Sequence, residues 1–370
     1  MSMVEWKKLG EVANLVRGKV ISKDYIRDFE GEYPVYSSQT ANDGILGYIK
    51  SYMFDGDYLT WTTDGAYAGT IFRRKGKFSI TNVCGLIDIT DCNVHQDFLY
   101  FWLSKTAKNY VLEGMGNPKL MSNVASTIHI PIPSLQEQNR IVGILDTFTA
   151  SIDNLKEQIA QRRKQYEYYR DQLLDLEGKE DIHSWGEFCK MEKGNGVQKA
   201  DFEEEGIGCI HYGQIYTHYG PYTYETNKFV SKEIFDKAKK ASKGDIIMTD
   251  TSENVEDICK SVAWLGDEDI AVSNHALIIK HKQNPKFLSF STQTNSFLYQ
   301  KRKFVVGVKV SGIKPDDLAK IKIYLPAIKK QNHIVSILDT FEASILNLEA
   351  QLSQREKQYE YYRNKLLTFV

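Results

Sequence analysis

The sequence predicts an α+β protein in which two similar domains are separated by two long helices that pair as an antiparallel coiled coil. Three observations predict this fold. A stretch of about fifty residues occurs twice, and each copy carries a heptad pattern of apolar residues. The segment before each copy alternates short strand-like runs with turns rich in Gly, Asp and Asn.

The repeat organises the chain. Residues 128–177 align without a gap on residues 321–370, and 29 of the 50 aligned pairs are identical. The shared stretches include the pair Gln138-Asn139, which returns as Gln331-Asn332, and an Ile-Leu-Asp-Thr-Phe run. The chain therefore contains an internal duplication.

Each copy reads as one long helix. Pro133 and Pro326 precede the copies, and no proline follows inside either one. A helix from about residue 135 to residue 176 would be roughly 60 Å long, at about 1.5 Å per residue. Apolar residues at alternating steps of three and four favour packing of one copy on the other. These positions are Leu145, Phe148, Ile152, Leu155, Ile159, Arg162, Tyr166, Tyr169, Leu173 and Leu176, and 193 residues later their counterparts from Leu338 to Phe369.

Each copy has one charged heptad position, Arg162 in the first and Arg355 in the second. In a fully overlapped antiparallel pair, Arg162 would face Leu352 and Arg355 would face Ile159. A polar core residue can fix the register of a coiled coil. The alternative is an arginine that extends along the seam into solvent.

The pattern divides the chain into a first domain (1–133), a central helix (134–177), a second domain (178–326) and a distal helix (327–370). The domains share faint similarity, such as Trp6 with Trp185 and Asn82 with Asn274. Residues 69–72 and 78–80 are expected to be strands, and residues 95–112 and 286–301 helices. Both domains close on an apolar strand followed by proline, at 128–133 and 321–326.

Composition excludes several classes of protein. The net charge of −1 means that any nucleic-acid site must be a local basic patch. The five cysteines are scattered and form no C-x-x-C pair, which argues against a zinc site or a disulfide framework and fits a reducing cytoplasm. No apolar run approaches 18 residues and residues 1–8 lack a signal-peptide core, so we expect a cytoplasmic protein without a membrane span.

No constellation for catalysis is found. The chain has no G-x-x-x-x-G-K-[ST] phosphate loop and no H-E-x-x-H motif. The Asn-Pro-Pro-aromatic tetrapeptide of adenine methyltransferases is also missing, because Asn117-Pro118 is followed by Lys119-Leu120. We expect no catalytic residue and no metal site, although a dispersed nuclease-type centre of acidic residues and lysine stays open.

The positive signals are for DNA contact. Residues 73–77 form a basic run expected in a turn between strands, and residues 301–303 form another expected just after a helix. Such residues bind phosphates, whereas polar side chains at 37–42, 62–67, 211–214 and 249–254 could read base edges. Ordinary solvated turns are the alternative interpretation. The candidates are Lys19, Ser38, Gln39, Asn42, Thr63, Tyr67, Arg73, Arg74, Lys75, Lys77 and Lys119 in the first domain, and Asn195, Lys199, His211, Tyr212, Gln214, Thr251, Ser252, Asn254, Lys301, Arg302, Lys303 and Lys309 in the second.

A tyrosine-rich segment near the end of each helix has two faces. Tyr166 and Tyr169 occupy heptad positions, so they are expected to pack between the helices. The remaining residues are expected to face outward and to form a partner surface that occurs once in each copy. They are Lys164, Tyr168 and Arg170, with the counterparts Lys357, Tyr361 and Arg363.

Taken together, these motifs carry a family resemblance. They are the opening Trp6–Glu11, the strand with its prolines at 130–133, and the most specific run, Gln136–Val142, followed by Leu145-Asp146. Over its whole length the sequence resembles the specificity subunit of type I restriction–modification systems. The second copy departs from the motif at residues 329–333, although the gap-free alignment of the two copies continues through this stretch.

The resemblance implies two target-recognition domains, each reading one half of a bipartite target in double-stranded DNA. The paired helices would set the spacing and dock two methyltransferase (modification) subunits, and restriction translocase subunits would join them. S-adenosylmethionine, ATP and Mg²⁺ are expected in the partner subunits, with no cofactor bound by this chain. The alternative from another class is a non-enzymatic coiled-coil adaptor between proteins.

Overall fold

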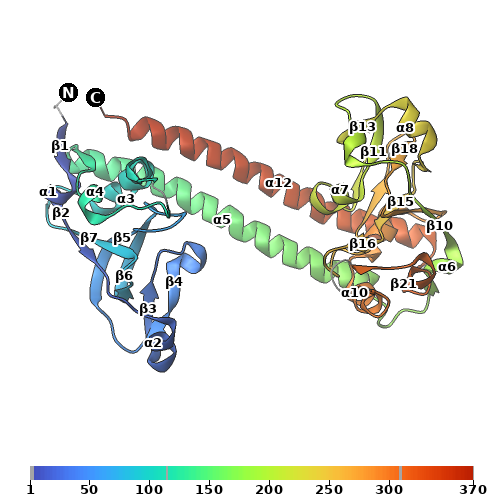
Figure 1. The fold of residues 1–370 in the computed structure, drawn as a ribbon, viewed down its shortest axis with the longest axis horizontal. Coiled ribbons are helices and arrows are strands. Elements are labelled where there is room, and N and C mark those ends of the chain that lie inside the picture. Colours follow the sequence, from blue (N-terminus) through green and yellow to red (C-terminus); the bar gives the residue numbers. More distant parts are fainter. Residues whose placement is uncertain (1–3, 114–115, 308–310, 370) are drawn as a thin grey trace. The chain divides into compact units, whose positions relative to one another are not determined.

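The computed structural model describes residues 4–113, 116–307 and 311–369. The chain divides into two compact units, unit 1 with residues 1–154 and 351–370, and unit 2 with residues 155–350. The two predicted long helices, α5 (Leu135–Leu174) and α12 (Ile328–Leu366), are present and contribute residues to both units (Figure 1).

Unit 1 is built on a mixed sheet of six strands. A separate ribbon pairs β1 (Glu5–Lys8) with β8 (His129–Ile132). The sheet order is β2 (Ala13–Arg17), β7 (Cys84–Ile89), β5 (Phe54–Thr62), β6 (Ile71–Ile80), β3 (Glu30–Tyr36) and β4 (Ile45–Ile49). The helices are α1 (Leu9–Val12), α2 (Lys23–Asp28), η1 (Ala41–Gly44), α3 (Gln96–Thr106), η2 (Ala107–Tyr110) and α4 (Ser122–Ala125).

Unit 2 contains two sheets and two short ribbons. The five-stranded sheet has the order β10 (Cys189–Lys193), β19 (Ala276–His281), β15 (Ile246–Thr249), β17 (Ser261–Trp264) and β12 (Tyr222–Thr223). The four-stranded sheet has the order β13 (Lys228–Val230), β11 (Ile207–Ile210), β18 (Ile270–Val272) and β14 (Lys240–Ala241). The ribbons are β9 (Ile182–Ser184) with β21 (Lys322–Tyr324), and β16 (Thr251–Ser252) with β20 (Ser311–Gly312). The helices are α6 (Trp185–Phe188), η3 (Lys199–Asp201), α7 (Tyr212–Thr217), α8 (Lys232–Lys237), α9 (Pro285–Ser291), α10 (Asn295–Arg302) and α11 (Pro315–Leu318).

The two units share one frame. In unit 1, β2, β7 and β5 are antiparallel neighbours, and in unit 2, β10, β19 and β15 form the same arrangement. A short helix precedes the first strand of each set, and Gly10 and Gly186 in these helices leave room for Ser126 and Ala319 at equivalent places. The α+β fold predicted for both domains is confirmed, and the additional strands differ between the units.

The long helices pair antiparallel within each unit. In unit 1, the ring of Phe148 on α5 stacks on the ring of Tyr362 on α12, with centroids 5.3 Å apart. In unit 2, Tyr169 on α5 stacks on Phe341 on α12 at 5.4 Å. Early residues of one helix therefore meet late residues of the other, as predicted. Apolar heptad side chains such as Leu145 and Leu338 are fully buried, and each contributes about 1.5–3 kcal/mol relative to exposure.

Three local predictions are wrong. Residues 71–80 form one strand, β6, instead of two strands joined by a basic turn, because the run pairs with β5 over eight positions. The helix expected over 95–112 ends at Thr106 and continues as the 3-10 helix η2. The helix expected over 286–301 is divided into α9 and α10, because Thr294 caps a new helix by accepting a hydrogen bond from the Phe297 amide at 3.3 Å.

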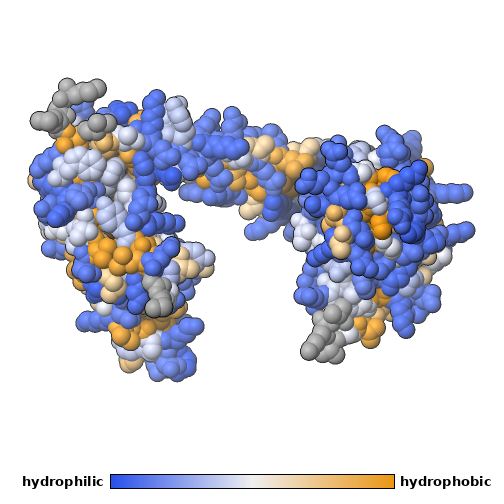
Figure 2. Space-filling model, turned by 45° about the horizontal axis from the view of Figure 1, so that its top comes forward, coloured by the Kyte–Doolittle hydropathy of each residue, from blue (hydrophilic) through white to orange (hydrophobic). Residues whose placement is uncertain are grey.

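The surface is largely hydrophilic. Figure 2 shows a polar face on each unit, interrupted by small apolar patches, which agrees with the mean hydropathy of −0.41. Over the described ranges 4–113, 116–307 and 311–369, every helix falls short of the length or the apolar character needed to cross a membrane.

Candidate nucleic-acid interface

The shared frame places a carboxylate and a cation at the same corner of each unit. In unit 1, Asp64 follows β5, and its carboxylate lies 3.7 Å from the guanidinium of Arg17 at the end of β2. In unit 2, Asp250 follows β15, and its carboxylate lies 3.0 Å from the ammonium of Lys193 at the end of β10. We call these the strand-end corners. Several of the predicted DNA-contacting residues lie around them.

Four candidates surround the corner of unit 1. The ammonium of Lys119 lies 3.7 Å from the Asp64 carboxylate, and Lys19 and Tyr67 are exposed. Thr63 is fully buried, and its hydroxyl donates a hydrogen bond to Asp64 at 2.5 Å. The expectation that Thr63 presents a polar group at the surface is therefore wrong, whereas the other three side chains are accessible to a ligand.

The candidate loop at residues 37–42 also comes close to this corner. Thr81 makes an isolated backbone bridge with Lys19, and its hydroxyl donates to the Ser37 hydroxyl at 3.1 Å. In the loop, Ser38 is half-buried and the amide of Gln39 donates to the carbonyl of Ile45. Asn42 is exposed in the left-handed conformation (φ 50°).

Neighbouring side chains of the basic run on β6 lie on opposite faces of the sheet, so some are buried and others are exposed. Arg74 is buried, its guanidinium lies 2.6 Å from the Asp43 carboxylate, and it stacks 3.6 Å from the centroid of Tyr36. This side chain is therefore structural, and the expectation of a phosphate contact from Arg74 is wrong. Because neighbouring residues of a strand point to opposite faces, Lys75 remains 87% exposed.

The other two basic residues of β6 are also engaged. The guanidinium of Arg73 lies 2.6 Å from Asp97 and 3.0 Å from Asp146, so it joins the sheet to α3 and α5. The ammonium of Lys77 lies 4.8 Å from the ring centroid of Tyr52, and the lysine side chain is exposed. Among the basic residues of this strand, Lys75 and Lys77 are therefore the ones whose side chains are most open to solvent.

In unit 2, the structure brings two predicted clusters together around one pocket of about 470 Å³. Tyr212 comes from the start of α7, and Thr251, Ser252 and Asn254 come from the segment after β15. The aromatic ring of His275 lies 5.3 Å from that of Tyr212. The remaining lining residues are Tyr216, Glu253 and Asp257. We call this the unit 2 pocket, and it lies beside the Asp250 corner.

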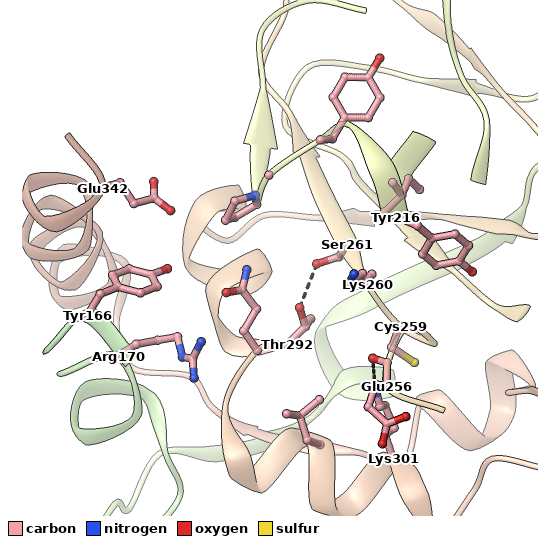
Figure 3. Close-up of a pocket in the computed structure, with 16 residues that line it drawn as sticks. Tyr166, Arg170, Tyr216, Glu256, Cys259, Lys260, Ser261, Thr292, Lys301 and Glu342 are labelled. Carbon is pink, nitrogen blue, oxygen red and sulfur yellow. Dashed lines mark hydrogen bonds between the residues drawn. The ribbon is translucent and has the colours of Figure 1, made fainter. Parts of the chain in front are cut away.

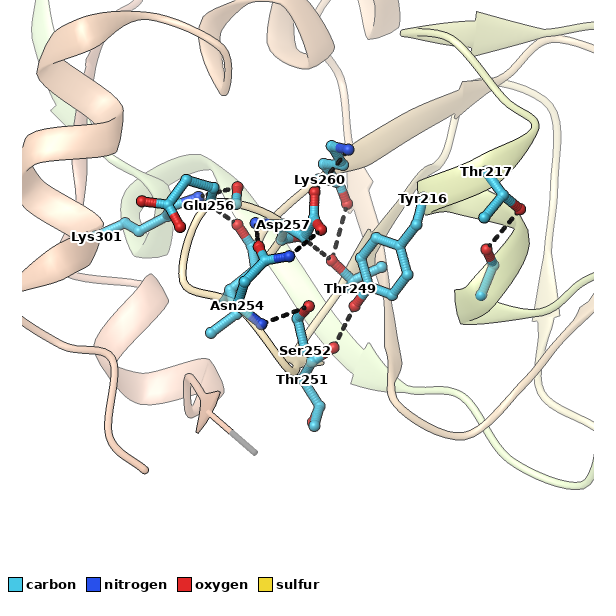
Figure 4. Close-up of polar contacts among 12 residues, drawn as sticks. Tyr216, Thr217, Thr249, Thr251, Ser252, Asn254, Glu256, Asp257, Lys260 and Lys301 are labelled. Carbon is cyan, nitrogen blue, oxygen red and sulfur yellow. Dashed lines mark hydrogen bonds and ion pairs between the residues drawn. The ribbon is translucent and has the colours of Figure 1, made fainter. Parts of the chain in front are cut away.

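The second basic cluster behaves differently from the prediction. Lys301 is 2% exposed and lies inside α10, where its ammonium donates to the carbonyls of Glu256 at 2.8 Å and Ile258 at 2.6 Å (Figure 4). Burial lowers the pKa of Lys301, against the raising effect of nearby carboxylates. Lys301 therefore holds the segment after β15 in place and is not available to bind phosphate. The expectation that Lys301 contacts DNA is wrong.

The neighbours of Lys301 stay at the surface. Arg302 is exposed with its guanidinium 3.3 Å from the Glu256 carboxylate, and Lys303 lies 4.4 Å from the ring centroid of Tyr299. Lys309 lies outside the described residues.

The remaining candidates of unit 2 are divided between surface and interior. Lys199 is exposed, and Asn195 is exposed with its side-chain oxygen accepting a hydrogen bond from the Lys239 amide at 2.8 Å. His211 is buried and caps α7, and burial lowers its pKa. Gln214 accepts a bond from the His211 amide at 2.7 Å, so both residues shape the turn.

The outer face of the helices is duplicated. Tyr168 is 60% exposed and Tyr361 is 59% exposed, and Lys164 and Lys357 are exposed as well. Each outer tyrosine packs edge-on against the next tyrosine along its helix, at 5.4 Å and 5.3 Å. The expectation that the arginines of this segment face outward is wrong, because the side chains of Arg170 and Arg363 are only 12% and 26% exposed.

The two heptad arginines lie against aromatic rings. The guanidinium of Arg162 lies 5.9 Å from the centroid of Phe341 in unit 2. That of Arg355 lies 5.7 Å from the centroid of Phe148 in unit 1. Both side chains are half-buried, as cation–π contacts at a helix seam allow.

Two pairs of anchoring residues were missed by sequence reasoning. Gln138 and Gln331 are fully buried at the starts of α5 and α12, where each bonds the turn before α3 or α9. Asp146 holds Arg73 in unit 1, and its counterpart Asp339 lies 2.9 Å from the ammonium of Lys286 in unit 2. Identity of these polar residues in both copies of the repeat was the available signal.

A further cavity in unit 2, of about 480 Å³, is lined by polar and apolar side chains from helices and sheet (Figure 3). Tyr166 and Arg170 of α5 and Glu342 of α12 form one side, opposite Ser261 and Thr292. Burial raises the pKa of the Tyr166 hydroxyl and of the Glu342 carboxyl. The repeat has threonine at the position equivalent to Glu342, so this chemistry is not duplicated. Across the part of the chain that the structure describes, no group of three His, Cys, Asp or Glu side chains is placed to hold a metal ion.

Comparison with known protein families gives a match in both halves of the chain. The family model described as type I restriction modification DNA specificity domain matches residues 1–162 and again residues 181–356. A Mycoplasma pneumoniae protein named as a type I specificity subunit is 29% identical over 376 residues, covering 98% of this chain and 97% of that protein. The specificity subunit of the type I restriction enzyme MpnII, from the same organism, is 40% identical over 169 residues, which cover 45% of this chain and 51% of that protein.

Two solved structures share the fold. The S subunit of a type I restriction–modification system from M. genitalium superposes with a TM-score of 0.60 at 14% identity, covering 100% of this chain and 98% of that chain. A chain from a study of assembly and conformational transition of the type I R-M system gives a TM-score of 0.61 at 14% identity, with 99% and 97% covered. At this identity the likeness concerns the fold alone.

Proposed function

Because the chain belongs to the family of type I restriction modification DNA specificity domains, we propose that it is the DNA-reading subunit of a type I restriction–modification complex. The observation that carries the proposal is the double match of the family model, joined to a duplicated frame with a strand-end corner in each unit. Two readers in one chain recognise two half-sites. The target is therefore bipartite double-stranded DNA.

The proposal divides the work between phosphate and base contacts. Exposed lysines such as Lys19, Lys75 and Lys77 supply salt-dependent affinity to the backbone of one half-site. Polar and aromatic residues of the strand-end corner and the unit 2 pocket contact base edges. The net charge of −1 is compatible with this division, since the cations act locally.

The duplicated outer face of the helices is proposed to dock two modification subunits. Tyr168 and Lys164 recur as Tyr361 and Lys357 with nearly the same exposure, although the heptad packing does not require their identity. Exposed tyrosines are common anchors at protein interfaces. Restriction translocase subunits would join the same assembly.

Catalysis is proposed to reside in the partners. The modification subunits would bind S-adenosylmethionine and methylate adenine, and the translocase subunits would use ATP and Mg²⁺, with no cofactor held by this chain. The reported matches do not favour the alternative of a coiled-coil adaptor.

The test is co-expression of the chain with its modification subunits, followed by sequencing of methylated bases in the host DNA. We expect a two-part methylated motif with a fixed spacer, and we expect neither methylation nor cleavage by the purified chain alone. Binding of the complex to DNA should weaken steeply as salt increases. Turnover of S-adenosylmethionine by the isolated chain, or a complex that leaves no methylated motif, would contradict the proposal.

A further inference from the structure

The segment after β15, residues 250–258, forms one wall of the unit 2 pocket. It contributes Thr251, Ser252, Glu253, Asn254 and Asp257 to the lining. The opposite wall is aromatic and comes from α7 and from the turn before β19. A polar wall facing aromatic rings gives the geometry of a site for a flat polar group.

This segment is held rigidly by its own hydrogen bonds. The side chains of Asn254 and Asp257 are joined at 2.6 Å, and the Asp257 amide donates back to Asn254 at 2.9 Å (Figure 4). Thr251 donates to the Asp250 carboxylate at 2.8 Å, and Ser252 accepts from the Asn254 amide at 3.3 Å. The hydroxyl of Tyr216 donates to the carbonyl of Thr251.

The buried Lys301 fixes the same segment from behind through the carbonyls of Glu256 and Ile258. Removing an ammonium group from water is costly, and here its hydrogen bonds serve to hold one loop in place. A site that discriminates between ligands gains from such preorganisation, because little ordering remains to be done on binding.

Glu253 differs from its neighbours. It is exposed at the pocket, and its carboxylate makes no hydrogen bond or ion pair with any described residue. The other polar side chains of the segment are occupied by partners within the protein. The acceptor that the wall offers to a ligand is therefore the Glu253 carboxylate.

A carboxylate only accepts hydrogen bonds, so it selects groups that donate them. In the major groove, cytosine presents its N4 amino group and adenine its N6 amino group, whereas guanine and thymine present oxygen acceptors. A free carboxylate against O6 or O4 would be repelled and left without water. The same group would thus favour an amino base and reject a keto base.

We infer that Glu253 is a specificity-determining residue of the second recognition domain, which accepts a hydrogen bond from the exocyclic amino group of an adenine or cytosine in its half-site. Tyr212 and His275 bound the pocket across from it and limit how the edge of the base can approach the carboxylate. This inference rests on the proposed function and adds to it the chemical class of base read at one position.

The test compares methylated motifs made by complexes that carry the wild-type chain, Glu253→Gln or Glu204→Gln. Gln can both donate and accept, so Glu253→Gln should admit keto bases at one position of one half-site. We expect the ratio of keto to amino sites methylated there to rise about tenfold or more. Glu204 is an exposed glutamate of the same domain outside the pocket, and its variant should keep the wild-type motif.

The possible results distinguish failure of the inference about Glu253 from failure of the proposed function. A rise of keto bases with Glu253→Gln, confined to one position where the wild-type complex requires adenine or cytosine, supports the inference and identifies the base. An unchanged motif with Glu253→Gln, or changes in both half-sites, would overturn it while the proposed function stands. Failure of the wild-type complex to produce a two-part motif counts against the proposed function instead.

Discussion

Replacement of the buried glutamine at the start of α12 should loosen unit 2 alone. Gln331 is fully buried, and its side-chain oxygen accepts a hydrogen bond from the Asn284 amide at 3.0 Å. Its amide group donates to the carbonyl of Pro326 at 2.7 Å and to the side chain of Gln283 at 2.8 Å. These bonds connect the helix with the turn that caps α9.

The magnitude follows from the groups left behind. Gln331→Ala leaves one backbone N–H and one backbone carbonyl without partners in the interior, at about 1–3 kcal/mol each. The cavity adds to this cost, so we expect a loss of about 3–5 kcal/mol of stability in unit 2. Gln138→Ala should have the same effect in unit 1, because Gln138 bonds the His95 amide and the carbonyls of Asn93 and Pro133, each at 2.8 Å.

Amide hydrogen exchange, resolved by peptide, measures the two units separately. Peptides of the β15 and β19 region should exchange at least one hundredfold faster in Gln331→Ala, since about 1.4 kcal/mol corresponds to a factor of ten. The control is Gln354→Ala, which removes an exposed glutamine from the same helix and should change exchange little. Unchanged protection in unit 2, or an equal loss in both units, would refute the reasoning.

Three further outcomes are expected. Arg74→Met should lower the stability of the chain by about 2–4 kcal/mol, because the arginine bonds Asp43 from a buried position, while Lys75→Met should change it by less than about 0.5 kcal/mol in the same thermal melt. Burial lowers the pKa of His281 to about 4, so its folded-state pKa lies below its unfolded value of 6.5. The stability that depends on neutral His281 is complete above pH 6.5 and is lost as the pH falls toward 4, by up to about 3 kcal/mol. Urea titrations at several pH values should show a smaller loss in His281→Phe, and equal losses in both chains would contradict the assignment. If the outer tyrosines dock the modification subunits, Tyr168→Ala combined with Tyr361→Ala should abolish co-purification of those subunits with little effect on the melting temperature, and full retention would count against the docking face.

Much of the fold could be predicted because the heptad pattern of apolar residues is visible in the sequence. The heptads locate α5 and α12 closely, and the terminal strands before Pro133 and Pro326 appear where expected. Short elements were less predictable. The basic run at residues 73–77 was expected in a turn, but Gly76 adopts a positive φ of 79° inside a strand that remains paired with β5.

The candidate site was predicted in outline and not in detail. Polar loops near residues 212 and 251 were selected from composition, and the structure brings them to one pocket. The basic residues were harder, because an arginine that binds phosphate and one that binds a buried carboxylate have the same sequence signal. Arg74 and Lys301 are distinguished from Lys75 and Lys303 only by burial, which depends on contacts with distant strands and helices.

The division of unit 1 between distant segments has a consequence for synthesis on the ribosome. Leu367 is buried in the core of unit 1, and the ring of Phe369 lies 6.1 Å from that of Phe98 and 5.9 Å from that of Trp102. Nearly two hundred residues separate Asn154 from Gln351, where the chain returns to this unit. At about 5–20 residues per second, the nascent first domain waits roughly 10 to 40 s for its last helical segment. During this interval an apolar surface around Phe98 and Trp102 is open to chaperones, or to the equivalent helix of another nascent chain.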